Sequence, residues 1–462
     1  MKTDLLADRH IGIQEADLPA MLEKIGVKSL DELINKTIPS KIRLKEPLAL
    51  AAPMTDREFA DHIAGMASLN KINTSYIGMG WYDTITPAVI QRNVFENPAW
   101  YTSYTPYQTE VSQGRLEALL NFQTVISDLT AMPLANCSLL DEATAAAEAA
   151  TMMYGLRSRD QQKKGTNVLF VDESIFPQNL AVIQTRVIPQ GMKIQVGNYK
   201  ELEFTPEIFA CIIQYPNASG SVEDYREFVE KAHAANCKVA VDADILSLAL
   251  LLPPGEWGAD IVFGSTQRLG IPLFYGGPSA AYFATRDEYK RNMPGRIIGL
   301  SKDKYGKICY RMALQPREQH IKREKATSNI CTAQALLATM AGFYAVYHGQ
   351  EGIKNIAKRI HSIATWLNKA LARLGYVQHN EIFFDTLRFS LPDHVSAQKL
   401  RTIALSKEVN LCYYDNGDVG FSIDETTDLK DVNLLLSIFS IAAAETMQED
   451  PDIHEASSLS RD

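Results

Sequence analysis

One strand-like segment ends in carboxylates that could take part in chemistry. Val239, Ala240 and Val241 form a short apolar run, and Asp242 and Asp244 follow it. Ligands of open α/β sheets bind at the carboxyl edge of the strands, where such residues lie. An aspartate at that edge can pair with the pyridine nitrogen of pyridoxal phosphate and keep the ring protonated as an electron sink. Many α/β strands end in aspartate for turn or capping reasons, and from this segment alone we favour that structural interpretation.

A pyridoxal enzyme also needs a lysine that forms a Schiff base with the cofactor. In the large pyridoxal folds this lysine follows the next strand, which we expect at residues 260–264. Gln267 and Arg268 occupy that place, and the next lysine, Lys290, lies beyond another expected strand at 280–284. Neither an amide nor a permanently charged guanidinium can form the Schiff base. We therefore predict no catalytic residue of this kind, and no pyridoxal phosphate bound covalently to this chain.

Alternating strand and helix patterns surround these residues. Short apolar runs predict strands, and segments with helical spacing lie between them. Such alternation predicts a mostly parallel sheet covered by helices on both faces. The strands are expected at 167–171, 193–196, 209–214 and 238–242, and the helices at 178–185 and 222–235.

The pattern along the chain predicts four parts. They are an N-terminal helical segment, a large α/β domain, an interdomain helix with a small α+β domain, and a polar tail, at 1–65, 66–330, 331–446 and 447–462. Helical spacing at 332–348 and 350–374 predicts the interdomain helix, and a last helix is expected at 429–444.

Composition excludes several classes of protein. Of the 462 residues 46% are hydrophobic and 22% charged, as in soluble globular proteins. The net charge is −9, and without a strongly basic stretch we expect no nucleic-acid partner. No apolar run reaches membrane-spanning length, the amino terminus lacks the apolar core of a secretory signal, and no metal-ligand spacing occurs. We expect a cytoplasmic protein with reduced thiols, since its six cysteines are spread singly: Cys137, Cys211, Cys237, Cys309, Cys331 and Cys412.

Seven motifs, in order along the chain, carry a resemblance to a known family. They are Tyr76-Ile-Gly-Met-Gly, Trp100-Tyr-Thr-Ser-Tyr-Thr-Pro-Tyr-Gln, Ser112-Gln-Gly-Arg-Leu-Glu-Ala-Leu-Leu-Asn-Phe-Gln, Ser138-Leu-Leu-Asp-Glu-Ala-Thr-Ala-Ala-Ala-Glu, Asp260-Ile-Val-Phe-Gly-Ser-Thr-Gln-Arg, Met293-Pro-Gly-Arg-Ile-Ile-Gly and Arg317-Glu-Gln-His-Ile-Lys-Arg-Glu-Lys-Ala-Thr-Ser-Asn-Ile-Cys331. The chain resembles the P-protein of the glycine cleavage system, glycine dehydrogenase (decarboxylating). The resemblance covers residues 9 to about 445 and is to the amino-terminal half, or to subunit 1 where the enzyme is split.

The resemblance implies a fold and a division of labour. The family has two homologous halves, each with the large pyridoxal-phosphate-transferase (aspartate aminotransferase-like) α/β domain and a smaller α+β C-terminal domain. Only the carboxyl-terminal half, or subunit 2, carries the Schiff-base lysine, so the absence of a lysine here is what the resemblance implies. Pyridoxal 5′-phosphate is then expected on the partner subunit, in an α2β2 hetero-oligomer, and this chain alone is expected to be inactive.

The resemblance also implies a reaction. Together with subunit 2 the chain is expected to decarboxylate glycine, release carbon dioxide and transfer the aminomethyl group to the lipoyl cofactor of the H-protein. Whether the chain is a natural subunit or a severed half stays open.

Four residues are candidate contacts to the partner's cofactor site. Tyr104 and Tyr107 combine a large rigid surface with a hydroxyl, or else they pack their loop onto this chain's own fold. Asn329 and Cys331, with Ser328, precede a long apolar helix whose backbone N–H groups could receive a phosphate or carboxylate. For this second segment we favour a simple helix cap near the interface.

Other interpretations remain for the chain and for single residues. His320 lies in a charged stretch, where a solvated or interface role is commoner than acid–base catalysis, and Asp242 with Gln267 would mark a site that has lost its cofactor. A free-standing pyridoxal enzyme of another family is one alternative function, and the missing lysine argues against it. The other is a protein that kept the fold, lost catalysis and acts as a binding or regulatory subunit.

Overall fold

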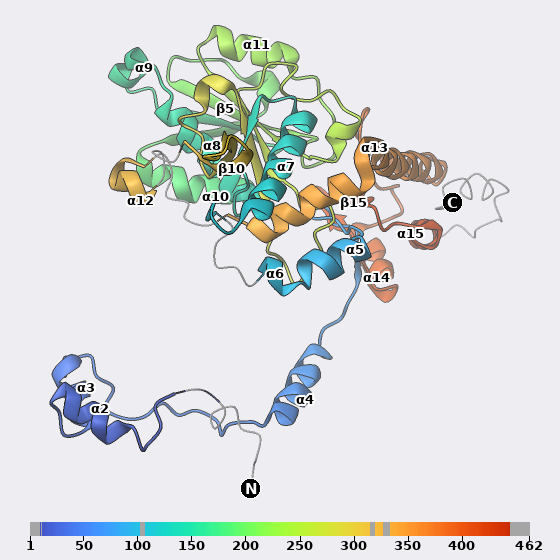
Figure 1. Ribbon diagram of the computed structural model, residues 1–462. Helices are drawn as coiled ribbons and strands as arrows, with labels where there is room; N and C mark the ends of the chain where they lie inside the picture. The colour runs from blue at the N-terminus through green and yellow to red at the C-terminus, as the bar shows by residue number, and fades with distance from the viewer. Residues whose placement is uncertain (1–9, 11, 102–106, 315–318, 327–332, 444–462) are drawn as a thin grey trace. The chain divides into compact units, whose positions relative to one another are not determined.

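The computed structural model describes residues 10, 12–101, 107–314, 319–326 and 333–443, which fall into two units, Met1–Ile72 and Asn73–Asp462 (Figure 1). The first unit contains the helices α2 (Leu18–Ile25), α3 (Leu30–Thr37) and α4 (Asp56–Ala67). Ser29 caps α3 by accepting a hydrogen bond from the Glu32 N–H at 3.2 Å. The prediction of short helices in this region is confirmed.

A seven-stranded sheet forms the centre of the second unit. Its strand order is β2-β8-β7-β6-β5-β3-β4, and the strands from β7 to β4 run parallel while β8 and β2 are antiparallel to their neighbours. The mostly parallel sheet predicted from the sequence is therefore confirmed, with one strand, β8, reversed. The bounds are β2 (Leu134–Ala135), β3 (Val168–Asp172), β4 (Lys193–Gly197), β5 (Ile208–Tyr215), β6 (Lys238–Ala243), β7 (Ile261–Ser265) and β8 (Ala281–Thr285).

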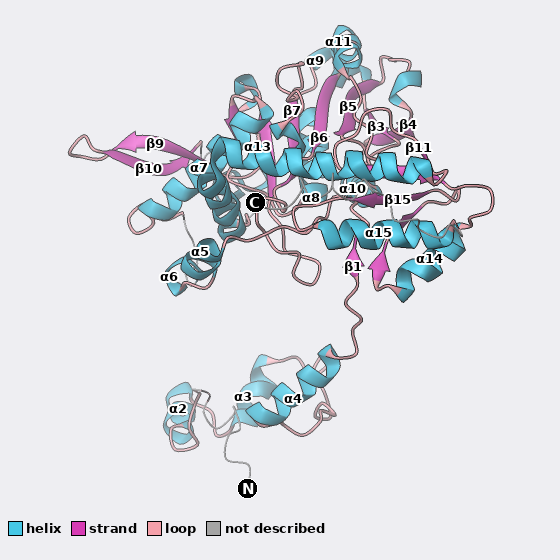
Figure 2. Ribbon diagram, turned by 90° about the vertical axis from the view of Figure 1, so that its right-hand side faces the viewer, coloured by secondary structure: helices cyan, strands magenta, loops and turns pink. Residues whose placement is uncertain are grey.

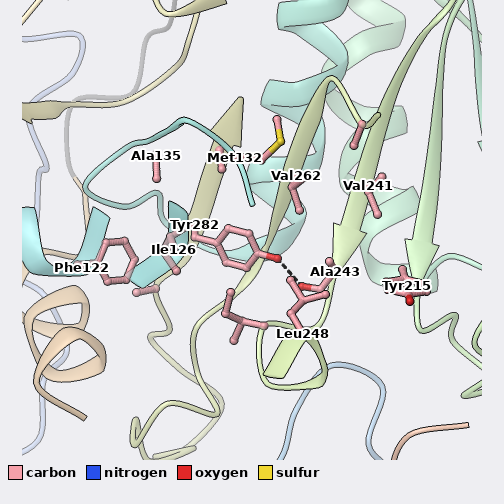
Figure 3. Close-up of a cluster of buried hydrophobic side chains, with 14 of the residues drawn as sticks. Phe122, Ile126, Met132, Ala135, Tyr215, Val241, Ala243, Leu248, Val262 and Tyr282 are labelled. Carbon is pink, nitrogen blue, oxygen red and sulfur yellow. Dashed lines mark hydrogen bonds between the residues drawn. The ribbon is translucent and has the colours of Figure 1, made fainter. Parts of the chain in front are cut away.

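Helices cover both faces of this sheet. On one face lie α7 (Gln113–Thr130), α11 (Arg226–Ala234) and the first half of α13 (Ala335–Arg373); on the other lie α8 (Glu142–Gly155) and α10 (Pro177–Val187). Successive strand residues point to opposite faces. Val239 and Val241 accordingly join the first core, part of which Figure 3 shows, and Ala240 joins the second. By the same alternation Asp242 faces α8 and α10.

A smaller four-stranded antiparallel sheet, in the order β11-β12-β15-β14, packs against the second half of α13 and two further helices. Its elements are β11 (Val377–Gln378), β12 (Thr386–Ser390), β14 (Cys412–Tyr413), β15 (Val419–Ser422), α14 (Ala397–Ser406) and α15 (Leu429–Ala442). Gly349 interrupts α13 with a φ of +63°. Because only glycine adopts this conformation without strain, the two predicted helical segments join through a kink at that residue.

Two pairs of short strands stand apart from these sheets. β1 (Thr74–Ser75) pairs in parallel with β13 (Val409–Asn410), and β9 (Ile297–Lys302) forms an antiparallel hairpin with β10 (Ile308–Ala313). Neither pair was predicted from the sequence. The remaining elements are short: α5 (Ala88–Ile90), η1 (Gln91–Phe95), α6 (Pro98–Tyr101), α9 (Arg159–Lys164), η2 (Ile188–Gln190), η3 (Tyr199–Glu201), η4 (Ser247–Ala249), η5 (Asp287–Tyr289), α12 (Gln319–Lys322) and η7 (Arg323–Lys325).

Candidate functional site

The carboxyl ends of β5, β6 and β7 surround a small pocket. Its other walls come from residues 79–82, the start of α8 and the start of β12. The cavity measures about 30 Å³, which is room for one or two water molecules and far below the roughly 300–1,000 Å³ of ordinary cofactor sites. The lining residues are Met79, Gly80, Tyr82, Glu142, Phe176, Gln214, Pro216, Asn217, Ala218, Gly220, Asp242, Asp244, Ser265, Arg268, Asp385 and Thr386.

The side-chain amide of Gln267 is fully occupied in holding the backbone around this pocket. Its Nε2 donates to the carbonyl oxygens of Tyr82 and Ile271, at 2.8 Å each, and its Oε1 accepts from the Tyr82 N–H at 3.2 Å. Gln267 therefore ties the loop around Tyr82 to the turn after β7. Removing the amide would leave buried backbone groups without partners, which costs about 1–3 kcal/mol for each group.

Arg268 fills the neighbouring position with a buried ion triad. Its side chain is 4% exposed, and its Nη1 donates to Oδ2 of Asp244 at 2.5 Å and to Oδ2 of Asp385 at 2.6 Å. The guanidinium carbon lies 3.8 Å from the centre of the Tyr82 ring. Asp385 directly precedes β12 of the small sheet, whereas Arg268 follows β7 of the large one. The triad therefore joins the two sheets across the pocket.

The attraction between the charges of this triad offsets part of the free-energy cost of burying them. Burial raises the pKa of Asp385 to about 6, since the attraction of Arg268 offsets it only in part. Burial lowers the pKa of Arg268, but the carboxylates of Asp244 and Asp385 outweigh it and leave a net rise. The guanidinium of Arg268 therefore carries its positive charge at neutral pH.

The carboxyl group of Asp242 is also buried and engaged. Its Oδ2 accepts a hydrogen bond from Nδ2 of Asn179 in α10 at 2.7 Å, and the carboxyl group of Glu142, at the start of α8, interacts with it. Burial, and then this neighbouring carboxyl group, raises the pKa of Asp242 well above its usual range. Burial likewise raises the pKa of Glu142 to about 7. The pair therefore keeps a proton near neutral pH.

Pyridoxal phosphate does not fit the residues at this edge of the sheet. Gln267 and Arg268 stand where an amine is needed, and the cavity has room for only one or two water molecules. A ring nitrogen that is to stay protonated needs an ionised aspartate, whereas Asp242 shares its surroundings with a second carboxyl group and retains a proton. The charged residues around this pocket are suited to pairing with one another inside a packed core.

The structure describes only one of the four candidate contacts to a partner's cofactor. Tyr107 packs against the first core, and the guanidinium carbon of Arg296 lies 4.2 Å from the centre of its ring. Tyr104, Asn329 and Cys331 lie outside the described residues, as does Ser328. His320 is in α12, and its side chain is likewise outside the description.

Four residues that complete the site were not singled out from the sequence. They are Tyr82, Glu142, Asn179 and Asp385. One signal was present for Asp385: a buried guanidinium after a buried strand requires carboxylates, so Arg268 called for acidic partners somewhere in the chain. Nothing local identified which acidic residues these are, because Arg268 and Asp385 are 117 positions apart.

A larger hollow, of about 590 Å³, lies where α7 and η4 pass the kink of α13. Apart from Asp128, Gln350 and Lys354, its lining side chains are apolar or small. In the part of the chain that the structure describes, no group of three or more His, Cys, Asp or Glu residues is arranged to hold a metal ion. No described helix is both long enough and apolar enough to cross a lipid bilayer.

The central sheet, its two helical layers and the small α+β unit define the aspartate aminotransferase-like fold class. Alanine–glyoxylate aminotransferase from Nostoc sp. superimposes with a TM-score of 0.53 at 15% identity, over 88% of this chain and 98% of that chain. This likeness concerns the fold alone.

Within that class, the chain belongs to the glycine cleavage system P-protein family, whose sequence pattern matches residues 8–439. It is 77% identical over 461 residues to glycine dehydrogenase (decarboxylating) of Bacteroides thetaiotaomicron. The aligned region covers 100% of this chain and 49% of that protein. A crystal structure of glycine decarboxylase (P-protein) of the glycine cleavage system, in inhibitor-bound form, superimposes with a TM-score of 0.83 at 29% identity, over 94% of this chain and 99% of that chain. The chain therefore spans about half the length of the curated relative.

Proposed function

We propose that this chain is the lysine-free half, or subunit 1, of a glycine decarboxylase, and that it works with a half that carries pyridoxal phosphate on a lysine. The observation that carries the proposal is the ion triad of Arg268, Asp244 and Asp385, beside Gln267, where the Schiff-base lysine of this fold class would stand. The name and the greater length of the curated relative support it as well.

The complete enzyme would decarboxylate glycine, release carbon dioxide and transfer the aminomethyl group to the lipoyl cofactor of the H-protein. Pyridoxal phosphate on the other half supplies the electron sink for the decarboxylation. The part of this chain is to bind that half, to cover its cofactor pocket and to exclude water from it. Tyr104, Tyr107, Asn329 and Cys331 stay the predicted contacts to that pocket.

We further infer an α2β2 assembly in the cytoplasm. One interface between the two halves gives an αβ pair, and a two-fold axis between two such pairs then gives the α2β2 assembly. Cys137, Cys211 and Cys237 are free and buried, which suits a reducing compartment.

Mixing the two halves tests the proposal. The measurement is the exchange of labelled carbon dioxide into the carboxyl group of glycine, with H-protein and pyridoxal phosphate present. We expect exchange from the mixture and none from this chain alone. The control is a mixture with a partner half in which the Schiff-base lysine is replaced by alanine. This mixture should show no exchange of labelled carbon dioxide.

Borohydride reduction locates the cofactor in the same samples. Borohydride fixes the pyridoxyl group to the lysine that forms the Schiff base, and we expect this group on the partner half only. A pyridoxyl group on this chain, or glycine exchange without a partner, would contradict the proposal. If no lysine-bearing half restores activity or co-purifies, the binding or regulatory alternative takes its place.

A further inference from the structure

The β9–β10 hairpin projects from the body of the second unit (Figure 2). Its base is clamped by two glutamines of α7. Gln123 accepts from the Ile298 N–H at 2.7 Å and donates to the Ile298 carbonyl oxygen at 3.1 Å, and Gln113 makes the same two bonds with Tyr310, at 2.9 Å each. Each glutamine thereby replaces a missing neighbour strand at the base of the hairpin.

The turn at the tip is equally well formed. Oδ1 of Asp303 accepts hydrogen bonds from the N–H groups of Tyr305, at 2.8 Å, and Lys307, at 2.9 Å. The Asp303 N–H donates to the Lys307 carbonyl oxygen at 2.9 Å, and Gly306 adopts a φ of +81°. The side chains on the tip therefore project from a fixed backbone, which lowers the entropic cost of binding through them.

This fixed tip carries unbalanced positive charge. Lys302, Lys304, Lys307 and Arg311 are all exposed, and none of the four forms an ion pair with another residue that the structure describes. The carboxylate of Asp303 is committed to the turn. A local cluster of cations thus stands on a chain whose net charge is −9.

Between these cations the hairpin exposes apolar side chains. The exposed fractions are 62% for Leu300, 76% for Tyr305 and 71% for Ile308. Lys302 lies opposite Ile308 in the register, and Leu300 lies two residues before Lys302, so Leu300, Lys302 and Ile308 share one face. A two-stranded hairpin is marginal in water by itself, and a large exposed apolar group beside charge is typical of a contact surface.

We propose that the β9–β10 hairpin is the docking arm for an acidic protein, whose carboxylates meet Lys302, Lys304 and Lys307 around a small apolar contact with Leu300, Tyr305 and Ile308. The inference rests on the proposed function, which requires a carrier protein that presents the lipoyl group. The arm belongs to that carrier because the carrier must arrive and leave at every turnover. Complementary charge mainly speeds association, whereas a permanent subunit contact needs a larger apolar area.

Nucleic acid and anionic membranes also attract lysines, but the remainder of this chain is acidic. The negative electrostatic potential of the whole chain repels an extended polyanion such as a nucleic acid or a membrane surface. A small acidic protein contacts only the positively charged tip of the hairpin. An acidic protein surface is therefore the occupant that the charge distribution favours.

Charge reversal in the complete enzyme tests the arm. The variant combines Lys302→Glu, Lys304→Glu and Lys307→Glu, and the measurement is the dependence of the glycine exchange rate on the concentration of lipoylated carrier. We expect KM for the carrier to rise by roughly tenfold or more at low salt with kcat unchanged, and the salt dependence of KM to weaken. The conservative variant, with arginine at the three positions, should retain the native KM.

A second triple variant changes the net charge by the same amount elsewhere. It combines Lys163→Glu, Lys164→Glu and Lys193→Glu, three exposed lysines of α9 and β4, and it should leave KM unchanged. An unchanged KM in the hairpin variant would overturn the proposal. The proposal would also be overturned if the hairpin variant no longer bound the other half. It would be overturned as well if the native enzyme bound duplex DNA or anionic vesicles and the hairpin variant did not.

Free lipoamide in place of the carrier separates this inference from the proposed function. With lipoamide, the hairpin variant should match the native enzyme, because no protein surface has to dock. A native enzyme without exchange on either acceptor would overturn the proposed function, and the docking arm with it. A native enzyme active on both, with a hairpin variant equally impaired on both, would overturn the docking arm alone.

Discussion

Charged residues have opposite roles in two regions of the second unit. At the carboxyl edge of the central sheet they are buried and paired with one another, and they fill the place of a cofactor. On the β9–β10 hairpin they are exposed and make no ion pair among the residues described. A pocket closed by its own charges serves folding, whereas an uncovered cluster serves recognition. We therefore expect this chain to contribute to function through its surface, at the β9–β10 hairpin, and not through the pocket at the edge of the sheet.

The largest effect is expected from Arg268→Met. The substitution leaves Asp244 and Asp385 buried without their counter-ion, so we expect the free energy of unfolding to fall by about 3–5 kcal/mol in denaturant titration. Arg226→Met is the matched control, since Arg226 pairs with Asp224 at 2.5 Å on the surface, and it should change the free energy by less than about 1 kcal/mol. Equal losses in the two variants would break the distinction between buried and exposed charge.

Returning a lysine to the chain should destabilise it without restoring cofactor binding. Gln267→Lys removes the amide that bonds Tyr82 and Ile271 and places an amine in a buried site, at a cost of about 2–3 kcal/mol. Titration with pyridoxal phosphate should give no Schiff-base absorbance, because the cavity remains filled by Arg268. Gln190→Lys, at an exposed position, is the control for stability. A saturable absorbance band in the Gln267 variant would show that the lysine alone was missing.

The protonated carboxyl pair should give the pocket a characteristic dependence on pH. The pKa of Glu142 is about 7 in the folded chain against 4.5 when free, so the unfolded chain binds fewer protons between these values. Stability from this group is therefore full below about pH 4.5 and is lost as the pH rises through 7.

Glu142→Gln removes this titration while keeping the shape of the side chain. Between pH 5 and pH 8 we expect the variant to gain on the order of 2 kcal/mol relative to the native chain in urea unfolding. Parallel pH profiles for the two proteins would show that Glu142 titrates normally.

The smallest effect is expected at the tip of the hairpin. Lys304→Ala with Tyr305→Ala removes two exposed side chains that make little contact, so the free energy of unfolding should stay within about 0.5 kcal/mol of the native value. Thermal or urea unfolding of the isolated chain measures this. A loss above about 2 kcal/mol would mean that the tip supports the fold and would weaken the contrast with the pocket.

The sequence predicted the architecture well where burial leaves a local pattern. The strands β3, β6 and β7 are apolar runs because both of their faces are covered, and the kink of α13 falls on a glycine between two helical patterns. The direction of β8 and the β9–β10 hairpin were not predicted. An apolar run such as β8 carries no sign of its direction, and β9 and β10 are short mixed segments that end at Lys302 and begin after Lys307. The four-part division of the chain stays a prediction.

For the site, the sequence identified positions and the structure supplied their partners. The place of the missing lysine was readable because Gln267 and Arg268 follow a buried strand. The bonds of Gln267 reach Tyr82, 185 positions away, and no periodicity in either segment links them. Long-range pairing of polar side chains depends on how the elements pack, so it becomes visible only when the two sheets are placed together.

The ion triad around Arg268 also bears on the history of the chain. A lineage that regained the lysine would still hold a guanidinium and two carboxylates at the edge of the sheet. Removing Arg268 leaves two buried carboxylates without a counter-ion, and removing either carboxylate leaves Arg268 with one partner in place of two, so each intermediate folds less well than its parent. Selection for folding alone is then enough to keep these three charges at the edge of the sheet, because no single substitution exchanges the set without a loss of stability.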